Sequence, residues 1–246
     1  MTPKSLADRI AVVTGASRGI GAATALALAQ RGAHVVAVAR TVGGLEELDD
    51  RIRAAGSTAT LVPLDMKDHD GLVRLAVALN ERYGRVDVVV GNAGISGPSS
   101  PLPHVEPKAW DDVMAVNVTA NYHLIRCMDT LLRQSSAGRA VFITSDAAHR
   151  AIAYLGPYSA SKAALEVMAR TYAAEIVTTP VRVNLFSPGA IRTRMRAGVM
   201  PGEDPMTLDT PEQAAEKLVE LCLPDFNQTG KLCDYPTNTI RDFAAT

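Results

Sequence analysis

The sequence is poor in cysteine and has no excess of charge of either sign. Its 246 residues include three cysteines, Cys127, Cys222 and Cys233, which form neither a CxxC motif nor a zinc-binding spacing. We therefore expect no metal site and a reducing, intracellular setting. Lys and Arg number 25 against 26 Asp and Glu. Nucleic acids and anionic membranes require a basic surface, so neither is an expected partner.

Long apolar runs are also missing. No run reaches the roughly 18 residues that a membrane-spanning helix needs. The first residues, MTPKSLADR, lack the apolar stretch of a secretory signal. Hydrophobic residues nevertheless make up 47% of the chain, which is typical of a globular protein. Together these features predict a cytoplasmic protein.

Short apolar runs alternate with helical patterns along the chain. The predicted strands are 10–14, 34–39, 59–64, 86–90, 140–144, 181–186 and 231–235, and the predicted helices are 22–30, 45–55, 71–83, 107 to about 134, 158–177 and 211–222. Such alternation requires right-handed crossovers and a parallel sheet covered by helices on both faces. The sequence therefore predicts an α/β fold, a single doubly wound (Rossmann) domain of three layers over residues 1–246. The one irregular segment, 194–210, is long enough to indicate a functional or mobile loop.

A glycine-rich turn, TGASRGIG, joins the first predicted strand to the first predicted helix over residues 14–21. In this context Gly15 permits a tight turn, Gly19 lets the backbone approach a pyrophosphate, and Gly21 allows close packing of helix on strand. The free N–H groups of the helix then face the phosphates. The turn therefore predicts a dinucleotide site.

The end of the second predicted strand indicates which dinucleotide binds. An NAD enzyme carries an Asp or Glu there to hold the ribose hydroxyls, but this chain has Ala39 followed by Arg40. A planar guanidinium suits a 2′-phosphate, and Arg18 inside the glycine turn adds a second positive charge. We therefore predict NADP as the cofactor.

Tyr158 and Lys162 form a YxxxK motif on a predicted helix, where residues four apart share a face. A free tyrosine has a pKa near 10, about three units too high for a base at neutral pH, but a neighbouring ammonium favours the phenolate. Tyr158 can then act as general acid or base. Ser145 follows the fifth predicted strand, at the edge where ligands bind in such sheets, and its hydroxyl can hold a substrate oxygen. Thr144 offers a rival hydroxyl.

With these motifs in place, the chain resembles the compact single-domain branch of the short-chain dehydrogenase/reductase family, from about residue 7 to residue 233. The TGxxxGxG spacing and the YxxxK motif carry the resemblance. It implies a catalytic set of Asn117, Ser145, Tyr158 and Lys162. Within that set, Asn117 is expected to hold a water that links Lys162 to solvent, and Lys162 to bind the nicotinamide ribose.

The resemblance also implies the residues of the cofactor site. These are Gly15, Ser17, Arg18, Gly19, Ile20, Gly21, Arg40, Asp65, Asn92, Ala93, Gly94, Tyr158, Lys162, Pro188, Gly189, Ile191 and Thr193. Asp65 is expected at the adenine amino group and Asn92-Ala93-Gly94 at the adenosine ribose. The chain departs from the usual Asn-Asn-Ala-Gly motif at Gly91, which leaves Asn92 in place.

The substrate is the least determined feature. His149, Arg150 and Tyr154 are candidate pocket residues, and the resemblance makes 194–210 a substrate lid with Met195, Met200 and Met206. Flexible methionines suit an adaptable apolar pocket, which favours a medium-sized carbonyl compound, but simple packing of the lid explains them equally well. The family resemblance further implies a homodimer or homotetramer, although the residues after Leu232 depart from the family's usual ending.

These observations predict an NADP-dependent oxidoreductase, a carbonyl reductase or alcohol dehydrogenase, that moves a hydride between nicotinamide C4 and a carbonyl or carbinol carbon. Two alternatives stay open: an NAD-dependent alcohol dehydrogenase of the same family, and a catalytically silent NADP-binding sensor or scaffold. A nucleotide-sugar epimerase or dehydratase would need a longer chain after Thr193. An enoyl reductase of this fold would have a longer gap between tyrosine and lysine than Tyr158 and Lys162 show.

Overall fold

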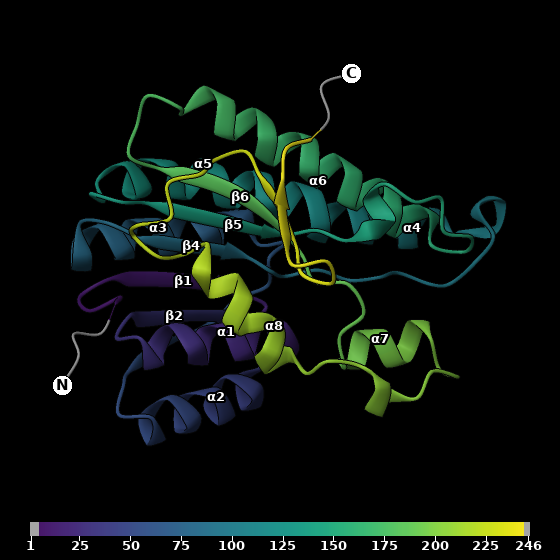
Figure 1. Ribbon diagram of the computed structural model, residues 1–246, viewed down its shortest axis with the longest axis horizontal. Coiled ribbons are helices and arrows are strands. Elements are labelled where there is room, and N and C mark those ends of the chain that lie inside the picture. The colour runs from purple at the N-terminus through teal and green to yellow at the C-terminus, as the bar shows by residue number, and fades with distance from the viewer. Residues whose placement is uncertain (1–4, 244–246) are drawn as a thin grey trace.

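A computed structural model describes residues 5–243, so the first four and last three residues of the predicted domain lie outside the described part. The strands are β1 (Ile10–Thr14), β2 (His34–Ala39), β3 (Ala59–Pro63), β4 (Val88–Gly91), β5 (Arg139–Ile143), β6 (Arg182–Ser187), β7 (Leu232–Asp234) and β8 (Thr239–Arg241). They form one sheet in the order β3-β2-β1-β4-β5-β6-β7-β8 (Figure 1). All neighbouring pairs are parallel except β7 and β8.

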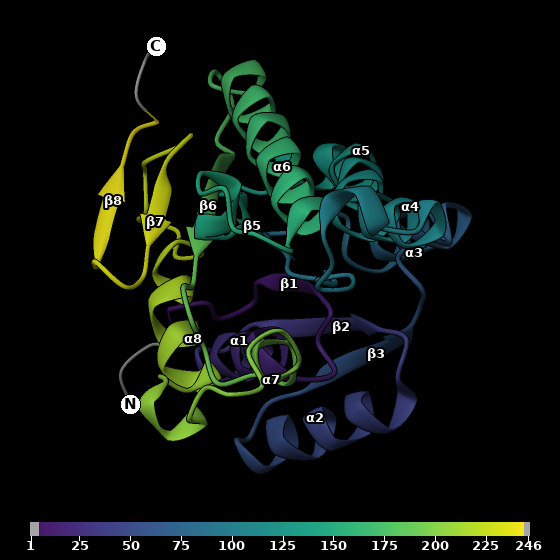
Figure 2. The ribbon, with the colours of Figure 1, turned by 90° about the vertical axis from the view of Figure 1, so that its right-hand side faces the viewer.

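Helices cover both faces of the sheet. They are α1 (Gly19–Gln30), α2 (Val42–Ala54), α3 (His69–Tyr83), α4 (Pro107–Met114), α5 (Ala120–Arg133), α6 (Gly156–Glu175), α7 (Arg194–Val199) and α8 (Pro211–Glu220), with short helical turns η1 (Leu102–His104), η2 (Ala115–Thr119), η3 (Asp146–Ala148) and η4 (Pro205–Thr207). Figure 2 shows α1, α2 and α8 on one side and α3 to α6 on the other. The predicted three-layer, doubly wound fold is therefore confirmed.

Alternate side chains of the central strands enter two apolar layers. Val13 and Val35 pack in the layer beneath α1, α2 and α8, whereas Val12 and Val36 pack in the layer beneath α3, α5 and α6. All four are fully buried, and each stabilises the fold by about 1.5–3 kcal/mol on leaving water. The sheet built in this way holds the loops at its carboxyl edge in fixed relative positions.

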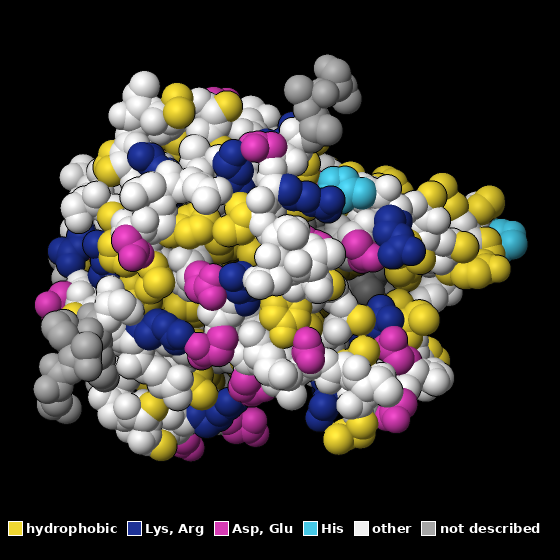
Figure 3. Space-filling view, viewed as in Figure 1, with side chains coloured by type: hydrophobic (Ala, Val, Ile, Leu, Met, Phe, Trp, Pro, Cys, Tyr) yellow, Lys and Arg dark blue, Asp and Glu magenta, His cyan; other side chains and the backbone are white. Residues whose placement is uncertain are grey.

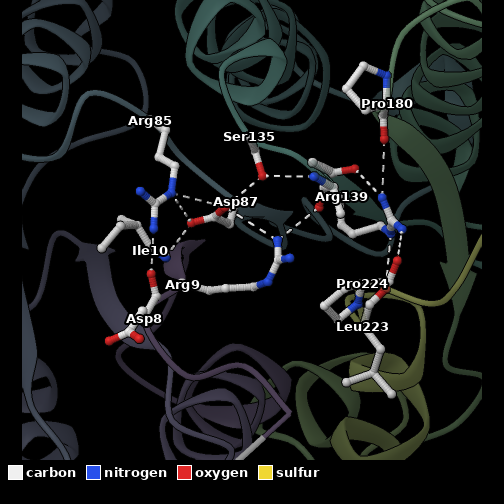
Figure 4. A network of polar contacts seen from close by, with 12 residues as sticks. Asp8, Arg9, Ile10, Arg85, Asp87, Ser135, Arg139, Pro180, Leu223 and Pro224 are labelled. Carbon is white, nitrogen blue, oxygen red and sulfur yellow. Dashed lines mark hydrogen bonds and ion pairs between the residues drawn. The ribbon is translucent and has the colours of Figure 1, made fainter.

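A polar network joins the strands at their opposite, amino edge (Figure 4). Asp87, which precedes β4, accepts hydrogen bonds from the Ile10 amide at 2.9 Å and the Ser135 hydroxyl at 2.6 Å. Arg9 and Arg85 form ion pairs with the same carboxylate at 3.3 and 3.2 Å. Because these groups come from the β1 and β5 ends of the sheet as well as from β4, the network fixes the relative position of the three strands.

The structure differs from the predicted elements in three places. The hairpin strand β8 was not predicted, because its three exposed residues show no apolar run. Within 194–210, predicted to be irregular, α7 and η4 form. The helix predicted over 107 to about 134 forms without interruption from Pro107 to Arg133, but its turn η2 between α4 and α5 is π-helical.

The surface and the helices give two further findings. On the face in Figure 3, Lys and Arg side chains are interspersed with Asp and Glu. None of the helices within residues 5–243 combines the length and the apolar composition needed to span a bilayer.

Candidate active site

A cavity of about 910 Å³ opens at the carboxyl ends of the parallel strands. Residues that follow six different strands line it: Gly15 after β1, Arg40 after β2, Asp65 after β3, Asn92 after β4, Ser145 after β5 and Pro188 after β6. Ligand sites in open parallel sheets form at this edge, where the strand order reverses between β1 and β4. The cavity therefore lies where the fold class predicts a dinucleotide.

Nearly all the predicted site residues meet in this cavity. The lining includes Gly15, Ser17, Arg18, Gly19, Ile20, Arg40, Asp65, Asn92, Ala93, Gly94, Ser145, Tyr158, Lys162, Pro188, Gly189, Ile191 and Thr193. Gly21 and Asn117 do not line the cavity. They lie behind it, where Gly21 packs against Gly15 and Asn117 packs against Gly94, both of which line the cavity.

The glycine turn has the close packing that its sequence predicts. Gly15 and Gly19 have left-handed backbone conformations, with φ of 65° and 58°. A Cβ on Gly15 would lie 2.8 Å from Asn92 Nδ2, and one on Gly21 would lie 2.4 Å from the Gly15 carbonyl oxygen. Arg18, the N-cap of α1, supplies no capping hydrogen bond. The first N–H groups of α1 therefore have no capping partner from that side chain and can bind a phosphate.

Thr14 and Asn92 brace this turn from the β4 side. Asn92 Nδ2 donates to the carbonyl oxygens of Thr14 and Gly15 at 2.9 and 3.2 Å. The Thr14 hydroxyl accepts from the amides of Asn92 and Ala93 at 3.0 and 3.1 Å. The sequence places Thr14 in the glycine-rich motif, but the motif alone assigns it no role, and the structure shows that its hydroxyl holds the loop after β4.

The structure also explains the glycine that replaces the family's usual asparagine. A Cβ on Gly91 would lie 2.4 Å from Phe142 Cδ1 and 2.6 Å from Asn121 Oδ1. The neighbouring side chains therefore fill the space that a longer residue would need, and the adjacent Asn92 keeps its bracing contacts.

Two arginines lie at the end of the cavity formed by the glycine turn and β2. The Arg40 side chain is 62% exposed, and its Nη1 lies 3.7 Å from Asp65 Oδ2. Within residues 5–243, Arg18 makes no ion pair. Asp65 accepts a hydrogen bond from the Lys67 amide at 2.9 Å, so it stabilises its own loop as well as facing the cavity. This end of the cavity has two cationic groups and one carboxylate.

Tyr158 and Lys162 lie one helical turn apart on α6, close to Ser145. Lys162 Nζ is 5.6 Å from the centre of the Tyr158 ring and donates to the Ile143 carbonyl oxygen at 2.7 Å. Burial lowers the pKa of Lys162 to about 8, an effect that the Glu166 carboxylate opposes. Burial raises the pKa of Tyr158, and a hydrogen bond with Ser145 opposes that rise. The phenol therefore needs a neighbouring positive charge to ionise near neutral pH.

Asn117 lies in the π-helical turn η2 and is fully buried. Its amide group accepts from the Ile95 amide and donates to the Ile95 carbonyl oxygen, both at 2.9 Å, and donates to the Ser161 hydroxyl at 2.9 Å. The side chain thus ties the loop after β4 to α6 beside Lys162. Its predicted role in holding a water remains a prediction.

The candidate substrate residues divide into two groups. Arg150 and Met195 line the cavity, whereas His149, Tyr154, Met200 and Met206 do not. His149 Nε2 instead lies 2.9 Å from Glu166 Oε2. The remaining three have large exposed fractions, 60%, 46% and 72% respectively. Which of these side chains reach the cavity depends on the tertiary path of the loop after β5 and of the segment 194–210. Local sequence patterns do not determine that path.

Comparison of the sequence with known proteins agrees with this arrangement of residues. The family model for short chain dehydrogenase matches residues 9–204. The chain belongs to the short-chain dehydrogenase family. The uncharacterized oxidoreductase YciK of Escherichia coli K12 is 38% identical to this short-chain dehydrogenase over 209 residues, which are 84% of this chain and 82% of that protein. The predicted family membership is therefore confirmed.

Solved structures of related proteins superpose on this fold along almost the whole chain. A short-chain dehydrogenase of Shigella flexneri 2a, complexed with NADP, superposes with a TM-score of 0.92 at 35% identity and covers 96% of this chain and 100% of its own. One from Escherichia coli CFT073, complexed with NADPH, has a TM-score of 0.91 at 35% identity and covers 96% and 99%. The likeness therefore extends past residue 204 into the C-terminal elements.

Proposed function

We propose that this short-chain dehydrogenase is an NADP-dependent oxidoreductase that interconverts an alcohol and a ketone or aldehyde, with Tyr158 as the general acid and base. The observation that supports the proposal is a single cavity whose lining includes Tyr158, Lys162 and Ser145 together with residues of the glycine turn. The two solved relatives that hold NADP or NADPH support the choice of cofactor.

The residues of the cavity suit NADP. Gly15 and Gly21 have no room for a side chain because Asn92 and the Gly15 carbonyl oxygen pack against them. Gly19, with a φ of 58°, presents bare backbone to the cavity, which suits a close approach of the pyrophosphate. Ala39 cannot bind ribose hydroxyls, and the exposed guanidinium groups of Arg18 and Arg40 suit a 2′-phosphate. The other predicted cofactor residues of the cavity would hold the adenine, the riboses and the nicotinamide.

Each group in the site has a separate role in the proposed reaction. When bound, the nicotinamide supplies or accepts the hydride at its C4. The Ser145 hydroxyl donates to the substrate oxygen and holds it beside Tyr158. In reduction Tyr158 gives its proton to that oxygen, and in oxidation it takes the proton from the alcohol. The Lys162 ammonium offsets the effect of burial and favours the phenolate. Asn117 keeps Lys162 and the loop after β4 in place.

We extend the proposal to the segment 194–210 as a lid over a medium-sized carbonyl substrate. Met195 and Val199 on α7 line the cavity, and Arg196 binds Glu203 through two contacts of 2.6 and 2.7 Å that close the segment on itself. Cofactor and substrate together should slow tryptic cleavage in this segment, and an unchanged rate would exclude a lid. A cytoplasmic homodimer or homotetramer formed by a single domain completes the proposal.

Substitution of Tyr158 by Phe tests the chemistry. The Tyr158→Phe protein keeps the ring but has no hydroxyl, so turnover should fall by about 10²–10⁴-fold, the usual contribution of acid–base catalysis. NADPH binding, followed by fluorescence, should stay within about twofold because the ring still fills the site. Retained turnover would remove Tyr158 from the proposed role.

The cofactor is tested by titrating the purified protein with NADPH and with NADH, side by side. Tight NADPH binding and weak NADH binding are expected. The reverse order would identify the NAD-dependent alternative, and binding of neither would exclude a nicotinamide enzyme.

A further inference from the structure

Glu166 is a buried carboxylate just behind the reacting groups. It lies on α6 one helical turn after Lys162 and is 3% exposed. Its Oε1 accepts from the Thr144 hydroxyl at 2.6 Å, and its Oε2 lies 2.9 Å from His149 Nε2. A carboxylate this buried destabilises a fold unless such partners satisfy it. Both partners flank the segment that carries Ser145.

We propose that Glu166 is a positioning residue of this active site: it joins the segment carrying Ser145 to the helix carrying Tyr158 and Lys162, and it places a negative charge behind the Lys162 ammonium. This inference rests on the oxidoreductase function proposed above. It gives α6 a positioning role, through Glu166, in addition to carrying the YxxxK motif.

The first role of Glu166 is to fix a distance between reacting groups. Ser145 comes from the end of β5, whereas Tyr158 and Lys162 come from α6, so their spacing depends on contacts between two elements. Thr144 directly precedes Ser145, and its bond to Glu166 connects the two elements at that point. Small misplacements of reacting groups cost large factors in rate, so this bond should affect turnover.

The second role of Glu166 is electrostatic. The charged groups near Glu166 are Lys162, one turn before it on α6, Arg170, one turn after it, and His149, whose Nε2 lies 2.9 Å from Glu166 Oε2. Burial raises the pKa of Glu166, while Thr144, His149 and Arg170 oppose the rise. Glu166 in turn opposes the effect of burial on the pKa of Lys162.

Without the negative charge of Glu166, Lys162 should therefore lose its proton at a lower pH. Lys162 is an amine whose pKa burial already lowers to about 8. Without Glu166 this pKa falls further, and the ammonium that activates Tyr158 is lost nearer to neutral pH. A merely structural role for Glu166 would lower stability and leave this pH dependence unchanged.

The Glu166→Gln variant separates the positioning role from the charge role. Glutamine keeps the volume and can still accept a hydrogen bond from Thr144, but it has no charge. With saturating NADPH and a ketone, the alkaline limb of kcat should move to lower pH by about one unit, a shift of the size that a neighbouring opposite charge produces. Thr144→Val removes the bond but leaves His149 and Arg170 to keep Glu166 ionised, so kcat should fall about tenfold at all pH values without that shift.

Glu175→Gln is the matched control, since Glu175 is exposed near the end of the same helix; its pH profile should equal that of the unmodified protein. An alkaline limb that does not move in Glu166→Gln would overturn the charge role. Unchanged turnover in Thr144→Val would overturn the positioning role.

A measurement without substrate separates this inference from the proposed reaction. The pKa of Lys162 can be followed by NMR in protein labelled with ¹³C at lysine Cε, with Lys162→Arg used to assign the signal. The pKa should be lower in Glu166→Gln than in the unmodified protein, even if no ketone or alcohol proves to be a substrate. Equal values would reject the charge role, whereas absent turnover in the unmodified protein would reject only the proposed function.

Discussion

At the scale of single residues, we propose that Arg40 decides which nicotinamide cofactor this protein binds. Arg40 lies at the end of β2, where a carboxylate would hold the ribose hydroxyls of NAD. Its side chain is 62% exposed and its nearest carboxylate, Asp65, is 3.7 Å away. Because that contact is long and exposed, it contributes little to stability, and Arg40 is free to turn toward a phosphate.

Arg40→Asp should reverse the cofactor preference. The new carboxylate repels the 2′-phosphate and accepts hydrogen bonds from ribose hydroxyls, so the ratio of NADPH to NADH affinity should fall at least about tenfold, given about 1.5–3 kcal/mol for a hydrogen bond to a charged group. Fluorescence titration with both cofactors measures the ratio. Arg74→Asp, at an exposed position on α3, should leave it unchanged, and an unaltered ratio in Arg40→Asp would show that Arg40 does not contact the phosphate.

At the scale of the elements, the packing of β4 against β5 sets the position of the glycine turn. β4 ends at Gly91, which has Phe142 of β5 on its side-chain side. The next residue, Asn92, braces the turn after β1. A change in the spacing between β4 and β5 is therefore transmitted to the cofactor site through one residue.

Gly91→Ala should destabilise the fold and disturb that brace. The added methyl group meets Phe142 at 2.4 Å, and overpacking of this kind typically costs about 1–3 kcal/mol. Gly43→Ala is the matched control: Gly43 lies in α2 with nothing near its Cβ position, so alanine there should stabilise by about 0.4–1 kcal/mol. Urea unfolding measures both free energies, and equal values would show that the space beside Phe142 is not restricted.

In the whole molecule, the polar network that stabilises the sheet and the candidate active site lie at opposite edges of the sheet. The Asp87 network joins the amino edge, whereas the cavity opens at the carboxyl edge. The chain near this network also contains Arg139, a buried guanidinium that donates to the carbonyl oxygens of Gly138, Leu223 and Pro224. Burial lowers the pKa of Arg139 to about 10, so it keeps its charge at neutral pH.

Asp87→Asn should therefore reduce stability without altering the site. Asparagine keeps the shape but leaves Arg9 and Arg85 without their counter-charge, and removal of one partner from a buried ion pair costs about 3–5 kcal/mol; partial exposure of the arginines places the expected loss at about 2–3 kcal/mol. Urea unfolding gives this value, and NADPH affinity of the folded protein should not change. Asp50→Asn, at an exposed position on α2, should alter neither quantity. A weaker affinity in Asp87→Asn would show that the two edges are coupled.

Local patterns in the sequence by themselves determined most of the fold and the list of site residues. Doubly buried strands must be apolar throughout, and a dinucleotide turn needs glycine at set spacings. Helical spacing of four puts Tyr158 beside Lys162 in any context. These features depend on residues close in the chain, so the layers, the glycine turn and the YxxxK pair could be predicted.

Contacts between distant residues were decided only by the tertiary structure. His149 was a candidate for the substrate pocket, but the fold brings it to Glu166, 17 residues further along the chain. The need for glycine at position 91 depends on Phe142 of another strand, and β8 adds to the edge of the sheet by pairing antiparallel with β7. Such contacts arise when elements pack, because packing joins positions whose separation along the chain has no fixed period.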